Sequence, residues 1–140
     1  MLDFLTVTKA LTDENRLRIM MAMRGREMCV CQVTAFLDLA PSTTSKHLSV
    51  LRQARLIEST KHGKWVYYRL ADPEKSSRAV RDALHLVLSN LSSHPAILRD
   101  EERIQEILRR EDSICADLDE SDKDCLHSLE IHSLETEVES

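Results

Sequence analysis

Glycine, proline and aromatic residues are scarce in this sequence, which has two Gly, three Pro and five aromatic residues among its 140 positions. That composition argues against an all-β sandwich and favours helices. Long apolar runs are missing as well, because the least charged stretch, residues 83–98, is too short to span a bilayer. Asp3 and Lys9 interrupt any signal-peptide pattern near the start. These absences predict a soluble, cytoplasmic protein without a membrane partner.

Catalytic patterns are also missing. The sequence shows no nucleophile–base pair, no phosphate-binding glycine loop and no paired carboxylates at a useful spacing, so we expect neither an enzyme nor an organic substrate. Cysteine, by contrast, occurs four times. In a reducing compartment these residues are better suited to be ligands or free thiols than a disulfide framework.

Charge is distributed unevenly along the chain, which the net charge of −5 conceals. Residues 1–70 carry eleven Lys and Arg against six Asp and Glu, whereas residues 111–140 carry one Lys against eleven Asp and Glu. A locally basic region can bind DNA even within an acidic protein. We predict one domain over residues 1–110, followed by an acidic, mobile C-terminal tail over residues 111–140.

Apolar residues recur at helical spacing through most of the first 110 positions, and branched and aromatic residues around Gly63 predict a β-hairpin. Asp13 and Ser42 are the expected caps of two helices. The predicted fold class is therefore mainly α, with four helices, a small hairpin and a fifth helix. The expected helices cover residues 2–11, 13–24, 30–38, 42–54 and 76–91, the strands cover 56–60 and 65–70, and a further helical piece runs from about 97 to 110.

A short helix, a tight turn and a second helix opening at Ser42 form a helix-turn-helix, and the hairpin carries cations at its tip. Small hydroxyl groups and a lysine on the outer face suit base edges and phosphates near a helix N-terminus. Any single cation is more often a solvated surface charge, but the ordered set predicts a DNA reader with a wing. The candidate DNA-binding residues are Ser42, Thr43, Thr44, Lys46, His47, Arg52, Lys61, His62 and Lys64.

The sequence resembles the arsenical-repressor (ArsR/SmtB) family, and within it the arsenite-responsive branch most. The resemblance lies in three segments that follow in order, ALTDENRLRI at 10–19, SKHL at 45–48 and WVYYRL at 65–70. The likeness covers roughly residues 5–95, most of the chain. It implies a winged helix-turn-helix, a homodimer built from the first and last helices, and a double-stranded operator that is released when an ion binds. Arg55 departs from the family, which usually has Gly there, so the shape of that turn stays open.

Cys29 and Cys31 form a Cys-Val-Cys motif directly before the helix-turn-helix. Thiolates are soft ligands that suit As(III), Cd(II), Pb(II) or Zn(II). Residues two apart on a regular helix point about 200° from each other, so these two converge on one ion only where the backbone is extended. The alternative is a pair of buried core residues, but Cys31 falls off the apolar stripe. The motif is similar to the family site that binds arsenite or cadmium.

Two thiolates do not complete an ion site, because As(III) takes three sulfurs in a pyramid and Cd(II) or Zn(II) usually takes four ligands. In the arsenite sensors that this chain resembles, a third Cys often follows at the position of Thr34. Cys115 and Cys125 are therefore candidate further ligands, with a bystander thiol as the alternative for each.

Asp82, His85 and His94 superficially match the family's zinc site on the last helix. That site is not expected, because Asp82 and His85 are three apart rather than two and Ile97 stands where an acidic ligand should follow His94.

Together these patterns predict a DNA-binding repressor of a resistance operon, released from its operator by As(III), with Sb(III) as a second inducer, bound to cysteine thiolates. A Cd(II)-, Pb(II)- or Zn(II)-responsive repressor of the same fold is one alternative. A repressor that responds to thiol oxidation is the other, in which a disulfide between the tail and the helix is more credible than a strained Cys-x-Cys disulfide.

Overall fold

Helix α2 (Glu14–Ala22) lies at the centre of the fold, and four consecutive residues, Ile19 to Ala22, are buried along its second half. The computed structural model describes residues 1–63 and 65–110, without the side chains of His62 and Trp65. Asp13 caps α2 as predicted, because its carboxylate accepts hydrogen bonds from the amides of Asn15 and Arg16. A buried helix of this kind needs cover on every side, which the other helices supply.

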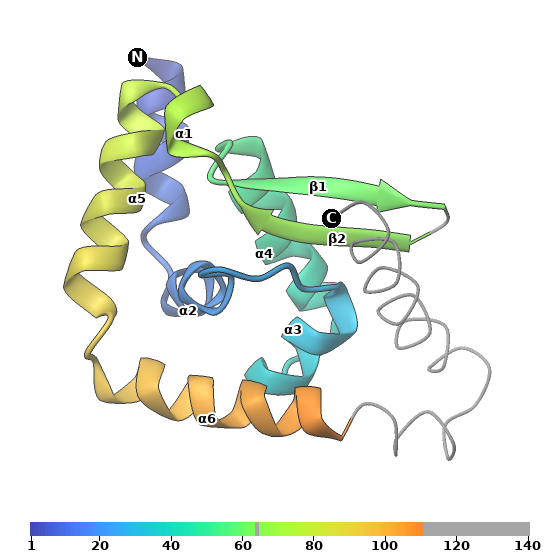
Figure 1. Cartoon of the computed structure of the whole chain (residues 1–140). Coiled ribbons are helices and arrows are strands. Elements are labelled where there is room, and N and C mark those ends of the chain that lie inside the picture. The colour runs from blue at the N-terminus through green and yellow to red at the C-terminus, as the bar shows by residue number, and fades with distance from the viewer. Residues whose placement is uncertain (64, 111–140) are drawn as a thin grey trace.

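Helix α5 (Arg78–Leu91) packs on one side of α2, with α1 (Leu2–Ala10) beside it. Helix α5 begins at Ser77, whose hydroxyl accepts a hydrogen bond from the amide of Val80. The two helices form the flank at the left of the molecule (Figure 1).

The predicted helix-turn-helix is formed by α3 (Val30–Leu37) and α4 (Pro41–Gln53), which pack against each other. The turn between them passes through Asp38, whose φ of 57° ends α3 in a left-handed conformation. The sequence predicted Ser42 as the cap of α4, and this prediction is wrong. Ala40 is the N-cap, and Pro41 is the first helical residue. Proline is favoured there because its ring fixes φ near the helical value and its missing amide has no helical partner to lose.

A single antiparallel hairpin forms the wing, with β1 (Ile57–His62) paired to β2 (Trp65–Leu70) from Ile57–Leu70 to His62–Trp65. Gly63 at the turn has a φ of 65°, a left-handed conformation that glycine adopts without steric cost. The hairpin extends away from the helices at the right of Figure 1. The winged helix-turn-helix predicted from the sequence is therefore present.

After α5 the chain turns at His94 into a separate helix, α6 (Pro95–Arg109), which runs along the far side of α2 and α3 (Figure 1). Its residues Ile97 and Ile104 are buried against the core. Of the two last helices, α5 is the one beside α1, and a short 3-10 turn, η1 (Pro73–Lys75), leads into it. None of the helices in the described ranges has the length and apolar character of a membrane span.

Candidate thiol site and nucleic-acid interface

Cys29 and Cys31 lie at the start of α3, where the chain passes from extended to helical backbone. Cys29 is the N-cap, with φ −91° and ψ 168°, and Val30 is the first helical residue. This change of conformation turns the two side chains toward each other, and their Sγ atoms lie 3.3 Å apart. At this distance the two sulfur atoms are in direct contact. The condition that the spacing sets, an extended backbone at the pair, is met at Cys29, whereas Val30 and Cys31 are already helical.

The surroundings of the pair differ on its two sides. Cys29 is buried, and its amide donates a hydrogen bond of 3.2 Å to Oε1 of Gln32, which is itself buried. Cys31 is half-buried. One helical turn further on, the hydroxyl oxygen of Thr34 is buried without a hydrogen-bond partner among the described residues. The pair can therefore be reached from the Cys31 side, while Cys29 and Gln32 anchor it to the core.

The segment before the pair is hydrogen-bonded to the wing, a feature that the sequence did not reveal. Met28 and Tyr68 exchange both backbone hydrogen bonds, each 2.9 Å long, as an isolated bridge beside β2. Arg69 adds two ion pairs, at 3.6 Å to Glu27 and at 3.3 Å to Glu58 on β1. Met28, the residue directly before Cys29, is thus hydrogen-bonded to the hairpin.

The outer face of α4 carries most of the predicted DNA-binding residues of this helix. Ser42, Thr43 and Lys46 are exposed, as a reading face requires. Thr44 is wrongly placed on that face by the sequence, since it is fully buried and its hydroxyl donates to the carbonyl of Ala40 at 3.3 Å. A small residue with a satisfied hydroxyl fits there because the first turn of α4 packs on the core.

His47 is half-buried and is held by a residue that sequence reasoning missed. The guanidinium of Arg16 lies 3.4 Å from Nδ1 of His47 and also donates to the carbonyls of Ala10 and Lys9. A guanidinium can only donate, so Nδ1 of His47 is the acceptor of this contact. Arg16 thereby joins the end of α1 to α4.

The structure describes only some of the cations predicted for the wing. Lys61 is exposed on β1, whereas Lys64 and the side chain of His62 lie outside the description, as do Cys115, Cys125 and the predicted acidic tail. Arg52 is exposed at the end of α4.

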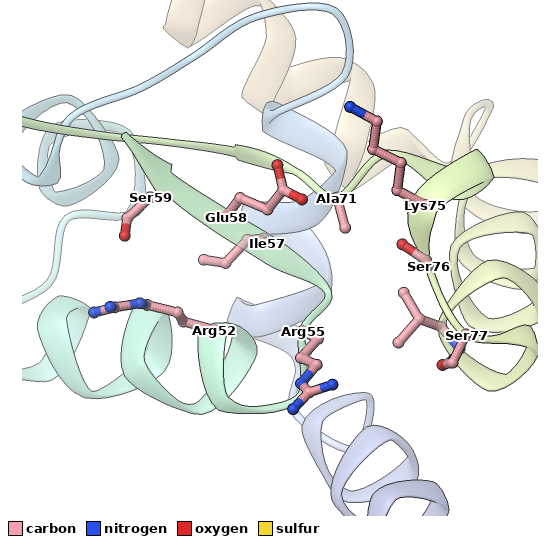
Figure 2. A pocket seen from close by; sticks show the side chains of 10 residues that line it. Arg52, Arg55, Ile57, Glu58, Ser59, Ala71, Lys75, Ser76 and Ser77 are labelled. Atoms are coloured by element: carbon pink, nitrogen blue, oxygen red, sulfur yellow. The ribbon is translucent and has the colours of Figure 1, made fainter. Parts of the chain in front are cut away.

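A pocket of about 380 Å³ opens at the base of the wing. Figure 2 shows Arg52 and Arg55 extending in different directions from the end of α4, and Lys75 pointing away from both. These three positive charges do not converge on one point, so the pocket lacks the focused charge that would hold an anion. Arg52 stays free to follow a DNA backbone.

Helix α6 is tied to the rest of the domain by charged groups. Arg18 of α2 makes two hydrogen bonds of 2.8 Å to the buried carboxylate of Asp100, and this contact raises the pKa of Arg18 against the opposing effect of burial. Arg26 lies 2.6 Å from both carboxylate oxygens of Glu101. Burial raises the pKa of Glu101, but the hydrogen bonds from Arg26 and Gln105 outweigh it, so the pKa lies below its usual value.

The residues that superficially match the family's zinc site have structural roles. Asp82 pairs with Arg78 at 3.7 Å along α5, and Nδ1 of His94 caps α6 by accepting from the amide of Ala96 at 3.1 Å. Within residues 1–63 and 65–110, no three or more His, Cys, Asp and Glu side chains are grouped so that they could hold a metal ion. The described thiol site thus consists of the pair alone.

Comparison with known proteins matches this arrangement to one family. The model of the family described as "Bacterial regulatory protein, arsR family" matches residues 13–59, which span α2, α3, α4 and the start of the wing. A cadmium resistance transcriptional regulatory protein CadC homolog of Staphylococcus aureus is 34% identical over 86 residues, which cover 60% of this chain and 70% of that protein. The chain belongs to the ArsR family.

Relatives of this chain differ in the resistance that their names state. The arsenic resistance transcriptional regulator ArsR1 of Pseudomonas putida is 42% identical over 65 residues, which cover 46% of this chain and 51% of that protein. The chain spans about half the length of the first curated relatives it matches. Arsenic and cadmium regulators therefore both stand among the relatives.

A solved structure of similar fold is the homodimeric winged helix-turn-helix DNA-binding domain of Mb0332 from Mycobacterium bovis, described as a possible ArsR-family regulator. It is 26% identical to this chain and has a TM-score of 0.54, and the match covers 66% of this chain and 81% of the other. The likeness supports the ArsR-type fold that the hairpin and α4 define.

Proposed function

We propose that this chain is a homodimeric transcriptional repressor that binds operator DNA and releases it when trivalent arsenic binds Cys29 and Cys31. The observation that carries the proposal is the thiol pair, 3.3 Å between Sγ atoms, placed at the start of the helix that precedes the recognition helix. Soft thiolates favour soft ions such as As(III) over the hard cations of the cell. Members of the family named for arsenic resistance add support.

DNA binding rests on the outer face of α4 and on the wing. Ser42, Thr43 and Lys46 are exposed on the first half of the helix, where short side chains approach base edges in the major groove. Lys61 on β1 and Arg52 at the end of α4 are exposed cations that suit phosphates. His62 and Lys64 remain candidates at the wing tip.

Release follows from the position of the pair between the two DNA-contacting elements. An ion that draws the sulfurs together acts on the backbone at Cys29, and Met28 passes the strain to Tyr68 through two hydrogen bonds. Helix α3 also packs directly on α4. A coupling of about 1–3 kcal/mol is enough to change operator affinity several-fold to a hundredfold.

A repressor that responds to Cd(II) is the second candidate, favoured by relatives named for cadmium resistance. It needs more donors than the pair, because Cd(II) and Zn(II) usually take four ligands. Cys115 and Cys125 stay candidates for that role, in the same subunit or its partner.

The test is operator binding of the reduced chain, followed by fluorescence anisotropy on a duplex selected by its affinity for the protein. We expect near-stoichiometric As(III) to release the duplex, and Cys29→Ser or Cys31→Ser to bind DNA normally but to ignore As(III). Release by Cd(II) or Zn(II) alone moves the assignment to the second candidate. Lys46→Ala is the matched control, since it weakens DNA binding without changing the response. Release by oxidant alone, reversed by reductant, would establish the redox alternative instead.

A further inference from the structure

The surface formed by α4 and β1 carries charge of almost one sign. Helix α4 contains no Asp or Glu, and Glu58 is the one acidic residue in positions 41–63. Glu58 is half-buried and pairs with Arg69 at 3.3 Å. Three cations of this surface are exposed and form no ion pair within the described part of the chain, namely Lys46, Arg52 and Lys61. These three residues define the basic face of the domain.

Basic side chains elsewhere in the domain are balanced by acidic ones. Arg18 of α2 pairs with Asp100 at 2.8 Å. Arg26 pairs with Glu101 at 2.6 Å. Helix α6 itself contains four acidic and three basic residues, so it presents both signs of charge. A polyanion that approaches the described domain therefore meets its least opposed positive charge on the basic face.

The same chain contains a polyanion. Residues 111–140 hold eleven Asp and Glu against one Lys, which gives this segment a net charge of −10. Carboxylates and DNA phosphates both offer anionic oxygens to Lys and Arg, and contacts of this kind supply much of the affinity of proteins for DNA. The segment is therefore a chemical substitute for the DNA backbone.

The acidic segment begins where it can reach the basic face. It follows Arg110, which ends α6, and α6 packs on α3, which in turn packs on α4. Figure 1 shows the C-terminal end of α6 on the same side of the molecule as the hairpin. Thirty residues can span at most about 100 Å, whereas the 13 residues of α4 are about 20 Å long. The segment is thus long enough to contact the basic face without any change in the domain.

We propose that the acidic segment, residues 111–140, binds the basic face of its own molecule and competes there with DNA. The proposal rests on the DNA-binding function proposed above and adds a regulation to it. A tethered competitor acts at an effective concentration on the order of millimolar, whatever the concentration of the protein. DNA has to displace the segment before it binds, so the segment lowers the affinity for the operator and for an unrelated duplex by the same factor.

The first experiment replaces all eleven carboxylates of residues 111–140 by amides, Asp→Asn and Glu→Gln, in the reduced full-length chain. Operator affinity, followed by fluorescence anisotropy, should rise at least about fivefold at about 50 mM salt and less than about twofold at about 500 mM salt, because salt screens the contact. The affinity for an unrelated duplex should rise by the same factor. An affinity that does not change at low salt overturns the proposal.

Two triple variants separate binding of the segment from a mere change in net charge, because each removes three carboxylates from the full-length chain. The first is Asp119→Asn/Glu120→Gln/Asp122→Asn, within the acidic segment. The second is Glu74→Gln/Glu102→Gln/Glu106→Gln, at exposed positions of the domain. At about 50 mM salt the first should raise operator affinity about twofold or more, and the second should leave it nearly unchanged. Equal effects of the two variants would show that net charge alone acts.

The place of binding is tested without DNA. Backbone amide signals in nitrogen–proton correlation spectra should differ between the full-length chain and the variant with eleven amides at Lys46, Arg52 and Lys61. The signals of α5 should be the same in both proteins. Differences confined to α6 would place the acidic segment on the helix that precedes it and would overturn the proposal.

Failure of the proposed function gives a different result. In that case the amide signals still differ at the basic face, but the chain has no affinity for duplex DNA that Lys46→Ala weakens. If Lys46→Ala does weaken DNA binding, while the eleven replacements change neither the spectra nor the affinity, the proposed function stands and the acidic segment does not bind the basic face.

Discussion

Arg55 holds a backbone conformation that side chains other than glycine rarely adopt, with a φ of 63° directly after α4. The sequence departs from the family at this position, yet the left-handed turn is kept. The left-handed conformation costs an L-residue about 1–2 kcal/mol, while glycine loses about 0.5–1 kcal/mol of conformational entropy on folding. The residue therefore stores strain between the recognition helix and the wing.

We expect Arg55→Gly to raise the free energy of unfolding by about 0.5–1 kcal/mol, the difference between these two costs. Urea unfolding followed by circular dichroism measures it. Gly25→Ala is the reciprocal control, because Gly25 has a φ of 67° with open space where a Cβ would be, so only backbone strain should destabilise it. A loss of stability in Arg55→Gly would show that the arginine side chain contributes more than its backbone costs.

Single residues also show which structural roles the sequence alone could predict. Asp13 was predicted as a cap and is one, because a cap depends on the two or three residues that follow it. Thr44 could not be placed correctly, since a hydroxyl side chain in a first helical turn looks the same whether it faces DNA or the core. The contacts of Arg16 and Arg69 could not be predicted, because their partners lie far along the chain or on another element.

At the scale of elements, the helices and the hairpin were predicted well, because periodicity and the turn at Gly63 are local signals. The convergence of Cys29 and Cys31 was predicted as a condition, and the N-cap geometry of α3 fulfils it. The pairing of Met28 with Tyr68 was beyond prediction. A backbone bridge does not depend on the side-chain pattern from which the sequence is interpreted. It also joins segments forty positions apart.

Arg69 tests whether that bridge carries the signal from the thiols to the wing. It pairs with Glu27 beside the thiol segment and with Glu58 on β1, so Arg69→Gln should loosen the link and reduce the ratio of operator affinities without and with inducer by several-fold. Anisotropy titrations give both affinities. Lys61→Gln is the control, because an exposed wing cation should weaken both affinities equally. An unchanged ratio in Arg69→Gln would exclude this route.

Helix α6 should make stability depend on pH through Glu101. Arg26 and Gln105 lower the pKa of Glu101 in the folded chain, so its contribution is fully present above the unfolded value of about 4.3 and is lost as pH falls through the folded value. We expect Glu101→Gln to be less stable than the parent near neutral pH, with the gap closing between about pH 5 and pH 3. Thermal unfolding over this range measures it, and the exposed Glu102→Gln should show no such gap.

At the scale of the whole molecule, α1 and α5 present an unusual amount of apolar surface. Leu2 is 80% exposed and Phe4 57% on α1, and Leu86 is 56% exposed on α5, although the two helices lie side by side. Large apolar side chains exposed on neighbouring elements mark an interaction surface. The other flank differs, since α6 is anchored within its own chain, to α2 through Asp100 and to the loop between α2 and α3 through Glu101. We therefore expect the dimer to form through α1 and α5.

Leu86→Glu should break this dimer, because a carboxylate would be buried without a partner in each copy of the interface. Sedimentation equilibrium should show a monomer at concentrations where the parent is dimeric, and operator affinity should fall at least about tenfold, since one recognition helix then has to bind alone. Leu98→Glu is the matched control, with a leucine 52% exposed on α6. If Leu98→Glu dissociates the dimer and Leu86→Glu does not, the interface lies on α6, and operator binding is organised around the flank that also covers the thiol helix.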